Sequence, residues 1–261
     1  MPAFAWNPRP FASVAAFSAY VASLGPAPRW AQGLTVHHTW SPDVDGWGGA
    51  RSMAGLGRYY QYSVQNLDGS RGWPAGPHLF IAPDGVIWQG TPLTVPGVHA
   101  GAWNRVFWGM EVVGNYDVKP WSPITQAAAM GAAAVLFRWA NIQTVSLATL
   151  RGHRECGSKK TCPGRQINMD VLRAALQTQL GPRLRTFTVA ARPLDADATF
   201  GAIREGRGAT FKVALDGTAR LAPGAKILVD DVTDGWAHIA KASPVYGDVG
   251  FVPVAQLIEA V

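Results

Sequence analysis

The chain has 261 residues, of which 48% are hydrophobic and 15% charged, so it can bury one or two hydrophobic cores. Its longest apolar stretches are shorter than the roughly 18 to 20 residues that cross a bilayer, and we expect no membrane span. The formal net charge of +6 favours an anionic partner. The chain has no run of five basic residues, which argues against nucleic acid and leaves a polyanion such as a cell-wall polymer.

Residues up to about 181 alternate between helical and strand-like patterns. The spacing of apolar side chains and the Gly/Pro stops predict helices over residues 12–24, 55–68, 124–140 and 169–180. Strands are predicted over residues 34–39 and 107–113, and an Asp-Gly turn joins residues 79–88 into a hairpin. This order predicts an α/β domain with a central mixed β-sheet flanked by helices.

The sequence pattern changes after Gly181-Pro182, which ends the last predicted helix. From Leu184 onward, short β-like runs alternate with Asp-Gly and Pro-Gly turns, which is typical of a small all-β barrel. We therefore expect two domains, 1–182 and 183–261, the first with an N-terminal helical extension over about residues 1–30.

The N-terminal residues combine Pro and Asn with no basic segment ahead of an apolar one, so we expect no signal peptide. A protein made in the cytoplasm without a leader would need a separate release route to reach a substrate outside the cell. We also expect a monomer.

The chain has two cysteines, Cys156 and Cys162, too few for a disulfide framework. We interpret Cys156 as a free or packed thiol, with a disulfide between the two as the alternative. Cys162 follows His153 by nine residues in a loop rich in Gly, Pro and Lys, and His37-His38 end a predicted strand. Imidazole and thiolate ligands suit zinc, and three protein ligands leave a fourth position for water. One catalytic zinc per chain is predicted, with His37 or His38 as a ligand because adjacent strand side chains face opposite sides.

Two further residues could complete a hydrolytic site. Glu111 lies in an otherwise apolar strand, where a carboxylate is costly unless it has a partner or a chemical role, so it is the candidate general base. The alternative is a solvent-facing glutamate on an edge strand. Lys160, two residues before Cys162, could place an ammonium group beside a developing oxyanion. Trp40, in a polar loop, could stack on a sugar ring.

Four ordered motifs carry a resemblance to a known family. They are Val36-His37-His38-Thr39, Gly97-Val98-His99-Ala100 with Asn104, Trp108 to Tyr116, and Gly152-His153-Arg154 through Lys160-Thr161-Cys162-Pro163-Gly164. Together they resemble the type 2 N-acetylmuramoyl-L-alanine amidases, the family shared with peptidoglycan recognition proteins and phage T7 lysozyme. The resemblance covers roughly residues 30 to 175.

The resemblance implies a mixed sheet flanked by helices, one zinc ion, and cleavage of the amide between the lactyl group of N-acetylmuramic acid and L-alanine in peptidoglycan. By position it implies the metal ligands His37, His153 and Cys162, with Glu111 activating water and Lys160 stabilising the transition state.

It also implies a substrate groove, to which we assign Trp40, His78, His99 and Asn104, with structural roles as the alternative for His78 and His99. One departure is Pro77-His78, where several relatives have a tyrosine before the second strand.

The C-terminal segments Asp234 to Ile239 and Gly250 to Val254 resemble bacterial SH3-like modules, which commonly bind cell wall. The sequence as a whole predicts a phage or prophage endolysin, with a bacterial autolysin as an alternative. A noncatalytic peptidoglycan-binding protein of the same fold is the rival from another class. The joint presence of His37, His153, Cys162 and Glu111 argues against it, because a pure receptor has no need of the metal set.

Overall fold

A computed structural model describes residues 3–181, apart from Leu67 and Ser158, together with five strands of the remaining chain. The chain divides into two compact units, Met1–Leu180 and Gly181–Val261. The first unit contains every candidate site residue, so its sheet and helices are described first.

A six-stranded mixed sheet forms the centre of the first unit, in the order β1-β4-β3-β5-β2-β6. Its strands are β1 (Arg9–Phe11), β2 (Gly33–His38), β3 (Leu79–Ile81), β4 (Ile87–Gln89), β5 (Phe107–Val112) and β6 (Leu150–Gly152). Strand β2 runs parallel to both β5 and β6, and β3 runs parallel to β5. The antiparallel pairs β3–β4 and β1–β4 complete the sheet at one edge. The carboxyl ends of β2, β3, β5 and β6 therefore meet on one side.

The two faces of the sheet differ in chemistry because side chains alternate along each strand. On one face, Leu34 and Val36 of β2 join Trp108 and Met110 of β5 in the main hydrophobic core. The opposite face carries polar side chains such as Thr35 of β2, and all of these residues are buried. Central parallel strands are covered on both faces, so the polar face must satisfy its groups within the protein.

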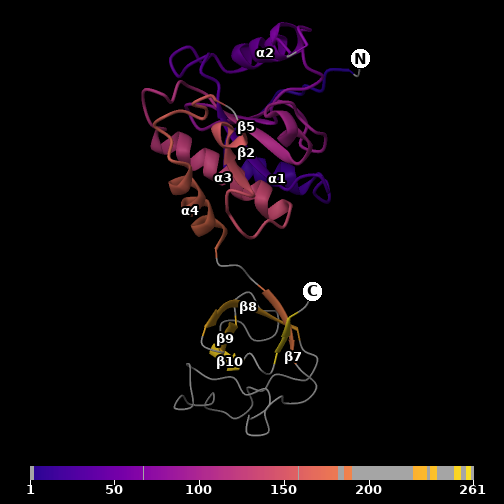
Figure 1. Ribbon diagram of the computed structural model, residues 1–261, viewed down its shortest axis with the longest axis vertical. Coiled ribbons are helices and arrows are strands. Elements are labelled where there is room, and N and C mark those ends of the chain that lie inside the picture. The colour runs from indigo at the N-terminus through magenta and orange to yellow at the C-terminus, as the bar shows by residue number, and fades with distance from the viewer. Residues whose placement is uncertain are drawn as a thin grey trace. The chain divides into compact units, whose positions relative to one another are not determined.

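Helices α1 (Val14–Ala22), α3 (Pro123–Trp139) and α4 (Met169–Leu180) cover the apolar face, whereas α2 (Ala50–Arg58) lies on the other side of the sheet (Figure 1). Helix α3 begins where the Ser122 hydroxyl accepts a hydrogen bond from the Thr125 amide (3.1 Å), with Pro123 in its first turn. Its alanine-rich sequence allows close packing against α1.

The structure agrees with most of the predicted elements and differs at three places. The helix predicted over residues 55–68 instead comprises α2 followed by a π-helical turn, η1 (Tyr59–Ser63). It starts earlier because the buried positions Met53, Leu56 and Tyr60 already follow helical spacing. The short edge strands β1 and β6 were not predicted, since three residues carry too little periodicity. The N-terminal segment is part of the fold, because β1 pairs with β4.

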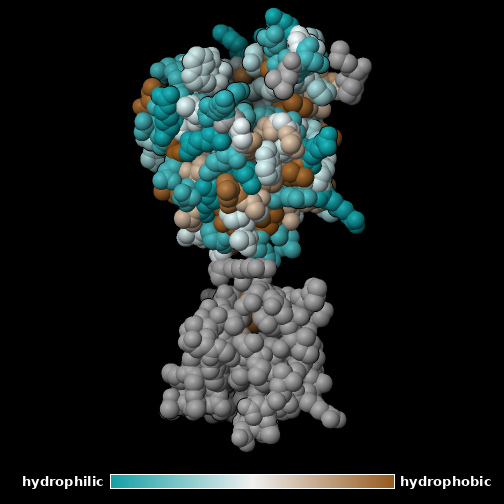
Figure 2. Space-filling view, in the orientation of Figure 1, coloured by the Kyte–Doolittle hydropathy of each residue, from teal (hydrophilic) through white to brown (hydrophobic). Residues whose placement is uncertain are grey.

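No helix in the described part of the chain has the length and apolar character needed to span a membrane. On the face of the first unit that Figure 2 shows, hydrophilic residues are interspersed with small groups of apolar residues. This distribution is ordinary for a protein surface in contact with water.

The second unit contains a five-stranded antiparallel sheet in the order β10-β9-β8-β7-β11. Its strands are β7 (Arg185–Val189), β8 (Lys226–Thr233), β9 (Trp236–Ile239), β10 (Gly250–Pro253) and β11 (Leu257–Glu259). Val229 and Ala237 are buried in it. The turns expected between these strands lie outside the described residues.

Gly131 of α3 offers a test of the helix packing. A Cβ at this position would lie 2.5 Å from Cγ2 of Val14 in α1. We expect Gly131→Ala to lower the free energy of unfolding by about 1 to 3 kcal/mol through overpacking, although alanine is the better helix former. The matched control is Gly55→Ala in α2, where a Cβ would have no neighbour within 4 Å. This change should raise the free energy of unfolding by up to about 1 kcal/mol. Equal effects of the two changes in denaturant titrations would contradict the packing argument.

Candidate metal centre

Three potential metal ligands meet at the carboxyl ends of β2 and β6. His37 is near the end of β2, His153 begins the 3-10 turn η3 (His153–Cys156) directly after β6, and Cys162 lies in the loop that follows. Their ligand atoms all lie within 4.8 Å of one another. The rings of His37 and His153 are 4.5 Å apart between centroids, and Nδ1 of His37 is 3.7 Å from Sγ of Cys162. Because β2 and β6 are adjacent and parallel, their ends deliver both histidines to one point.

His37 and His38 have different environments, as the alternation along a strand requires. The side chain of His37 is buried in the three-residue cluster, whereas His38 turns away and its Nδ1 accepts a hydrogen bond from the Tyr116 amide (3.2 Å). His38 contributes to the cluster through its backbone, whose amide donates to Sγ of Cys162 (3.4 Å). This contact stabilises negative charge on the sulfur.

The loop that carries Cys162 is held by two side chains. Arg154 donates hydrogen bonds from its guanidinium to the carbonyl oxygens of Thr161 (3.3 Å) and Gly164 (2.7 Å), and its amide donates to the Cys162 carbonyl (2.8 Å). From the other side, the Thr161 hydroxyl donates to the carboxylate of Asp117 (2.8 Å). These contacts fix the backbone on both sides of the sulfur.

The donor atoms of the cluster fit a zinc ion. Burial, with neighbouring positive groups, lowers the pKa of His37 well below its ordinary value and that of His153 to about 4, so both rings are neutral and have a lone pair to offer. Burial raises the pKa of the Cys162 thiol well above its ordinary value, so a nearby cation is needed to ionise it. Two imidazoles and one thiolate form a mixed nitrogen and sulfur set, which zinc prefers over magnesium or calcium.

Glu111 lies on the polar face of β5, directly beside His37 in the parallel register. Glu111 is 7% exposed, and its Oε2 atom has no hydrogen-bond partner among the residues that the structure describes. Burial raises the pKa of Glu111 to about 8, while Lys160 and a hydrogen bond with Tyr60 act in the opposite direction. Strand β5 is central, so the alternative of a solvent-facing glutamate on an edge strand is wrong.

Tyr60 is a site residue that the sequence analysis did not identify. It belongs to η1, its ring stacks on Trp73 (5.5 Å between centroids), and its side chain is hydrogen-bonded to Glu111. The sequence analysis looked for a tyrosine next to His78, whereas this one comes from the segment after α2. A tyrosine distant in sequence from both β5 and the metal cluster carries no local signal of this contact.

The cluster opens into a cleft of about 790 Å³. Its lining includes His37, Glu111, His153, Lys160 and Cys162, so the base and ammonium candidates share one space with the proposed ligands. The side chain of Lys160 is exposed and has an interaction within the protein. This arrangement can present an amide substrate to all five groups together.

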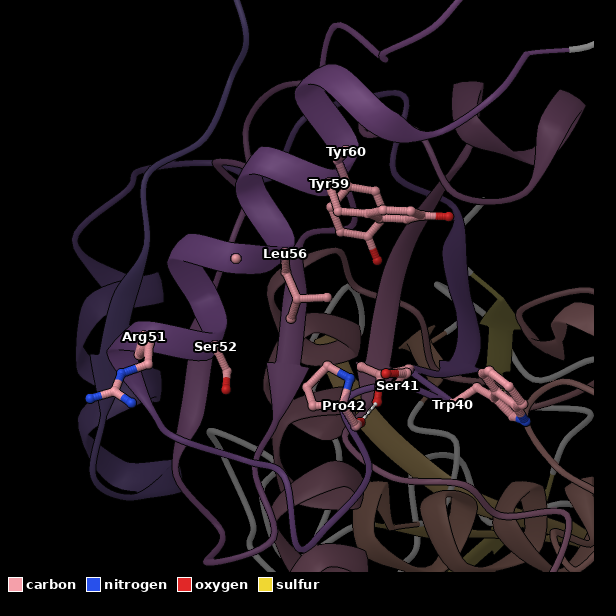
Figure 3. Close-up of a pocket in the computed structure, with 10 residues that line it drawn as sticks. Trp40, Ser41, Pro42, Arg51, Ser52, Leu56, Tyr59 and Tyr60 are labelled. Atoms are coloured by element: carbon pink, nitrogen blue, oxygen red, sulfur yellow. Dashed lines mark hydrogen bonds between the residues drawn. The ribbon is translucent and has the colours of Figure 1, made fainter.

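Two further hollows share lining residues with this cleft. One, of about 580 Å³, lies between α2 and the loop after β2; Figure 3 shows Leu56 facing Pro42 across it, with Trp40 and the Arg51 guanidinium at opposite ends. Trp40 is 62% exposed and borders both this hollow and the cleft. The other, of about 590 Å³, includes Asn104 in its polar lining. A long substrate could therefore extend from the cluster in two directions.

Three of the residues assigned to the substrate groove make contacts within the protein. His78 is 0% exposed and both of its ring nitrogens are engaged, with the Gly109 amide (2.9 Å) and the Val95 carbonyl (3.0 Å), which favours the structural role given as the alternative for His78. Asn104 borders the polar hollow, but its Oδ1 already accepts the amide of His99 (2.9 Å). His99 is 6% exposed behind His37.

These features define a mixed α/β protein with a His/His/Cys cluster that could hold a metal ion at the ends of parallel strands. The chain belongs to the N-acetylmuramoyl-L-alanine amidase family, whose model matches residues 27–165. Peptidoglycan-recognition protein SC2 of Drosophila melanogaster is 31% identical over 147 residues, which cover 46% of this chain and 78% of that protein. Peptidoglycan-recognition protein SC1a of the same fly is 30% identical over 148 residues, with the same coverage.

Solved structures with a similar fold include two bacterial and phage proteins. The N-acetylmuramoyl-L-alanine amidase LysC from Clostridium intestinale URNW has 23% identity and a TM-score of 0.43, and the match covers 56% of this chain and 85% of that one. The Ph2119 endolysin from Thermus scotoductus MAT2119 bacteriophage Ph2119 has 22% identity and a TM-score of 0.41, with 59% and 86% covered.

The raised pKa of Glu111 predicts a stability change with a defined sign. The pKa of Glu111 is 4.5 in the unfolded chain and about 8 in the folded, metal-free protein. Between these two values the folded state keeps a proton that the unfolded state releases, so the free energy of unfolding falls as pH rises from about 4.5 toward 8. Glu111→Gln removes this loss. We expect the metal-free variant to match the wild type near about pH 5 and to exceed it by more than about 1 kcal/mol near about pH 9, in denaturant titrations.

Glu155→Gln is the matched control for this experiment. Burial acts to raise the pKa of Glu155, but its ion pair with Arg173 (3.0 Å) lowers the pKa overall. Its carboxylate therefore stabilises the fold above its ordinary pKa, and this stability is lost as pH falls. Glu155→Gln should lower stability near pH 9. A loss of stability for Glu111→Gln at that pH would show that Glu111 is ionised and well solvated in the metal-free fold.

Proposed function

We propose that this protein is a zinc-dependent amidase that hydrolyses the bond between the lactyl group of N-acetylmuramic acid and L-alanine in bacterial peptidoglycan. The observation that supports it most is the convergence of His37, His153 and Cys162 with the buried carboxyl of Glu111 in one cleft. Membership of the amidase family supplies the substrate class. One zinc ion per chain, held by the three clustered side chains, is part of the proposal.

Zinc, when bound, supplies a Lewis acid that polarises the substrate carbonyl and lowers the pKa of water. Glu111 accepts a proton from the water whose oxygen attacks the lactyl carbonyl carbon. It then delivers that proton to the alanine nitrogen as the carbon–nitrogen bond breaks, so the Glu111 carboxylate is regenerated. The products are a lactyl carboxylic acid and a free amine, and the acid then gives its proton to the amine or to water. Tyr60 orients Glu111 through their hydrogen bond.

Lys160 contributes charge rather than proton transfer. Its ammonium group borders the cleft and acts electrostatically on Glu111, His37 and His153. A fixed positive charge at this point stabilises negative charge that develops on the carbonyl oxygen in the transition state. It also favours the ionised form of Glu111, which the proton-accepting step requires.

The hollows beside the cleft fit the two parts of such a substrate. The scissile amide joins a sugar to a peptide, so a bound substrate must extend on both sides of the cluster. The exposed indole of Trp40 suits stacking on a sugar ring, and Asn104 and His99 border the polar hollow. We assign Trp40 and Asn104 to substrate binding on this basis.

The second unit is proposed to be an SH3-like module that holds the enzyme on the cell wall, with residues 1–182 as the catalytic domain. A tether of this kind raises the effective concentration of the catalytic domain at an insoluble polymer without adding chemistry. The net charge of +6 suits anionic polymers of the wall as additional ligands. We propose wall lysis as the biological role, as in a phage endolysin, with a bacterial autolysin as the alternative.

The metal set and the base give separate signatures. We expect Cys162→Ser and His153→Ala to lose both zinc and lytic activity, whereas Glu111→Gln keeps zinc and loses about 10² to 10⁴ in turnover. Cys156→Ser is the matched control and should keep both, since Cys156 is a free thiol outside the cluster.

The measurements are zinc content by elemental analysis and mass spectrometry of digested peptidoglycan. Digests should contain free muramoyl lactyl carboxylates and peptides beginning with L-alanine. Wild-type protein that holds zinc and binds peptidoglycan but releases no such products would identify a noncatalytic receptor instead.

Deletion of residues 183–261 tests the role of the second unit. Because both units are compact, we expect residues 1–182 to fold, bind zinc and cleave soluble muropeptides at the full-length rate. Sedimentation with intact cell walls should decrease, together with the rate of wall lysis. Equal wall binding by the two proteins would show that the second unit does not anchor the enzyme.

A further inference from the structure

His99 lies behind the metal cluster, in contact with its central ligand. Its Nδ1 is 3.1 Å from Nε2 of His37, and its Nε2 is 3.1 Å from the carbonyl oxygen of Phe107. The ring of His99 lies against the backbone of β5 at Gly109. A Cβ added at Gly109 would lie 2.5 Å from Cγ of His99. Oδ1 of Asn104 accepts a hydrogen bond from the backbone amide of His99 and so fixes the backbone at this position. Four residues thus hold one buried imidazole in a defined orientation.

The hydrogen-bond partners determine where the protons on these rings lie. A carbonyl oxygen can only accept, so Nε2 of His99 carries a hydrogen and donates it to Phe107. His99 is 6% exposed, and burial favours the uncharged imidazole, so its Nδ1 has a lone pair. For the contact with Nδ1 of His99 to be a hydrogen bond, Nε2 of His37 must be the donor.

The same reasoning identifies the metal-binding atom of His37. A neutral ring that carries its hydrogen on Nε2 has its lone pair on Nδ1, the atom that faces Sγ of Cys162 at 3.7 Å. A metal-bound histidine ordinarily donates its other ring N–H to a carboxylate, a carbonyl or water, which fixes the tautomer and the ring orientation. Here His99 accepts the N–H of His37, and His99 in turn donates a hydrogen bond to the Phe107 carbonyl oxygen of β5.

We propose that His99 is a positioning residue for the metal centre: it accepts the Nε2–H of His37 and so presents the Nδ1 lone pair of His37 to the ion. The proposal rests on the proposed zinc site and replaces substrate contact as the main role of His99. It also gives a role to Asn104, which holds the His99 backbone, and to Gly109, where a side chain would collide with the His99 ring. His99 makes no bond to the metal in this arrangement.

His78 is a natural control for this role. Like His99 it is buried on the polar face, its Nε2 faces a backbone carbonyl, and its Nδ1 accepts a hydrogen bond, in this case from the Gly109 amide. The ring of His78 is 6.0 Å from that of His99, and none of its hydrogen bonds involves a proposed ligand. Loss of His78 should therefore reduce stability without changing metal affinity.

The experiment measures zinc affinity by competition with a chromogenic chelator in the full-length chain. We expect His99→Leu, which keeps bulk but removes the acceptor, to weaken zinc binding about 10- to 100-fold. His99→Asn places an oxygen near the position of Nδ1 and should restore most of the affinity. His78→Leu should lower the melting temperature as His99→Leu does, with zinc affinity within about twofold of wild type.

A second measurement needs no substitution. Long-range proton–nitrogen NMR spectra of the metal-free wild type report the tautomer of each histidine, and both His37 and His99 should carry hydrogen on Nε2. The opposite tautomer at either ring, or unchanged zinc affinity in a folded His99→Leu variant, would overturn the positioning role. A wild-type chain that fails to bind zinc would instead overturn the metal centre itself.

Discussion

The parallel pairing of β2 with its neighbours β5 and β6 is the constraint on which the site depends. Parallel strands end on the same side of a sheet, so His37, Glu111 and His153 reach one point from three separate parts of the sequence. The register also places His37 opposite Glu111, and alternation along the strands puts both on the polar face. A shift of one residue in either pairing would turn one of these side chains into the hydrophobic core.

The polar face would be costly without further partners, since buried polar groups require hydrogen bonds. The imidazoles of His78 and His99 meet this requirement as neutral groups that each accept and donate once. Charged side chains at positions 78 and 99 would lose their hydration, and no counter-ion among the residues that the structure describes would offset this cost. The face is therefore built mainly from groups that are polar but uncharged, and Glu111, whose Oε2 has no hydrogen-bond partner among the described residues, lines the cleft.

Residues close together in sequence were easier to predict than contacts between distant segments. His153, Lys160 and Cys162 lie within one short loop, and a strand that ends in two histidines predicts one inward ring, so their convergence could be inferred from spacing and resemblance. The contact of Tyr60 with Glu111 joins the end of a helical segment to a strand about fifty residues away, and no local pattern reports it. The choice between a groove role and a structural role for His78 could not be made from the sequence, because a histidine near a motif gives no indication of its burial.

Ionisation of the site and binding of a cation are coupled by the same burial. Without a cation, Cys162 and Glu111 are two acids in a poorly solvated space, each with a raised pKa, and ionisation of Glu111 further opposes that of Cys162. Of the groups that lower these pKa values, Lys160 is the one that acts on both Cys162 and Glu111. Its side chain is exposed, so water screens its charge. A divalent ion held by neutral His37 and His153 would lower both pKa values together, because both negative groups gain the same partner. The charge needed for proton transfer at Glu111 therefore depends on the ligands that His99 and the Cys162 loop hold in place.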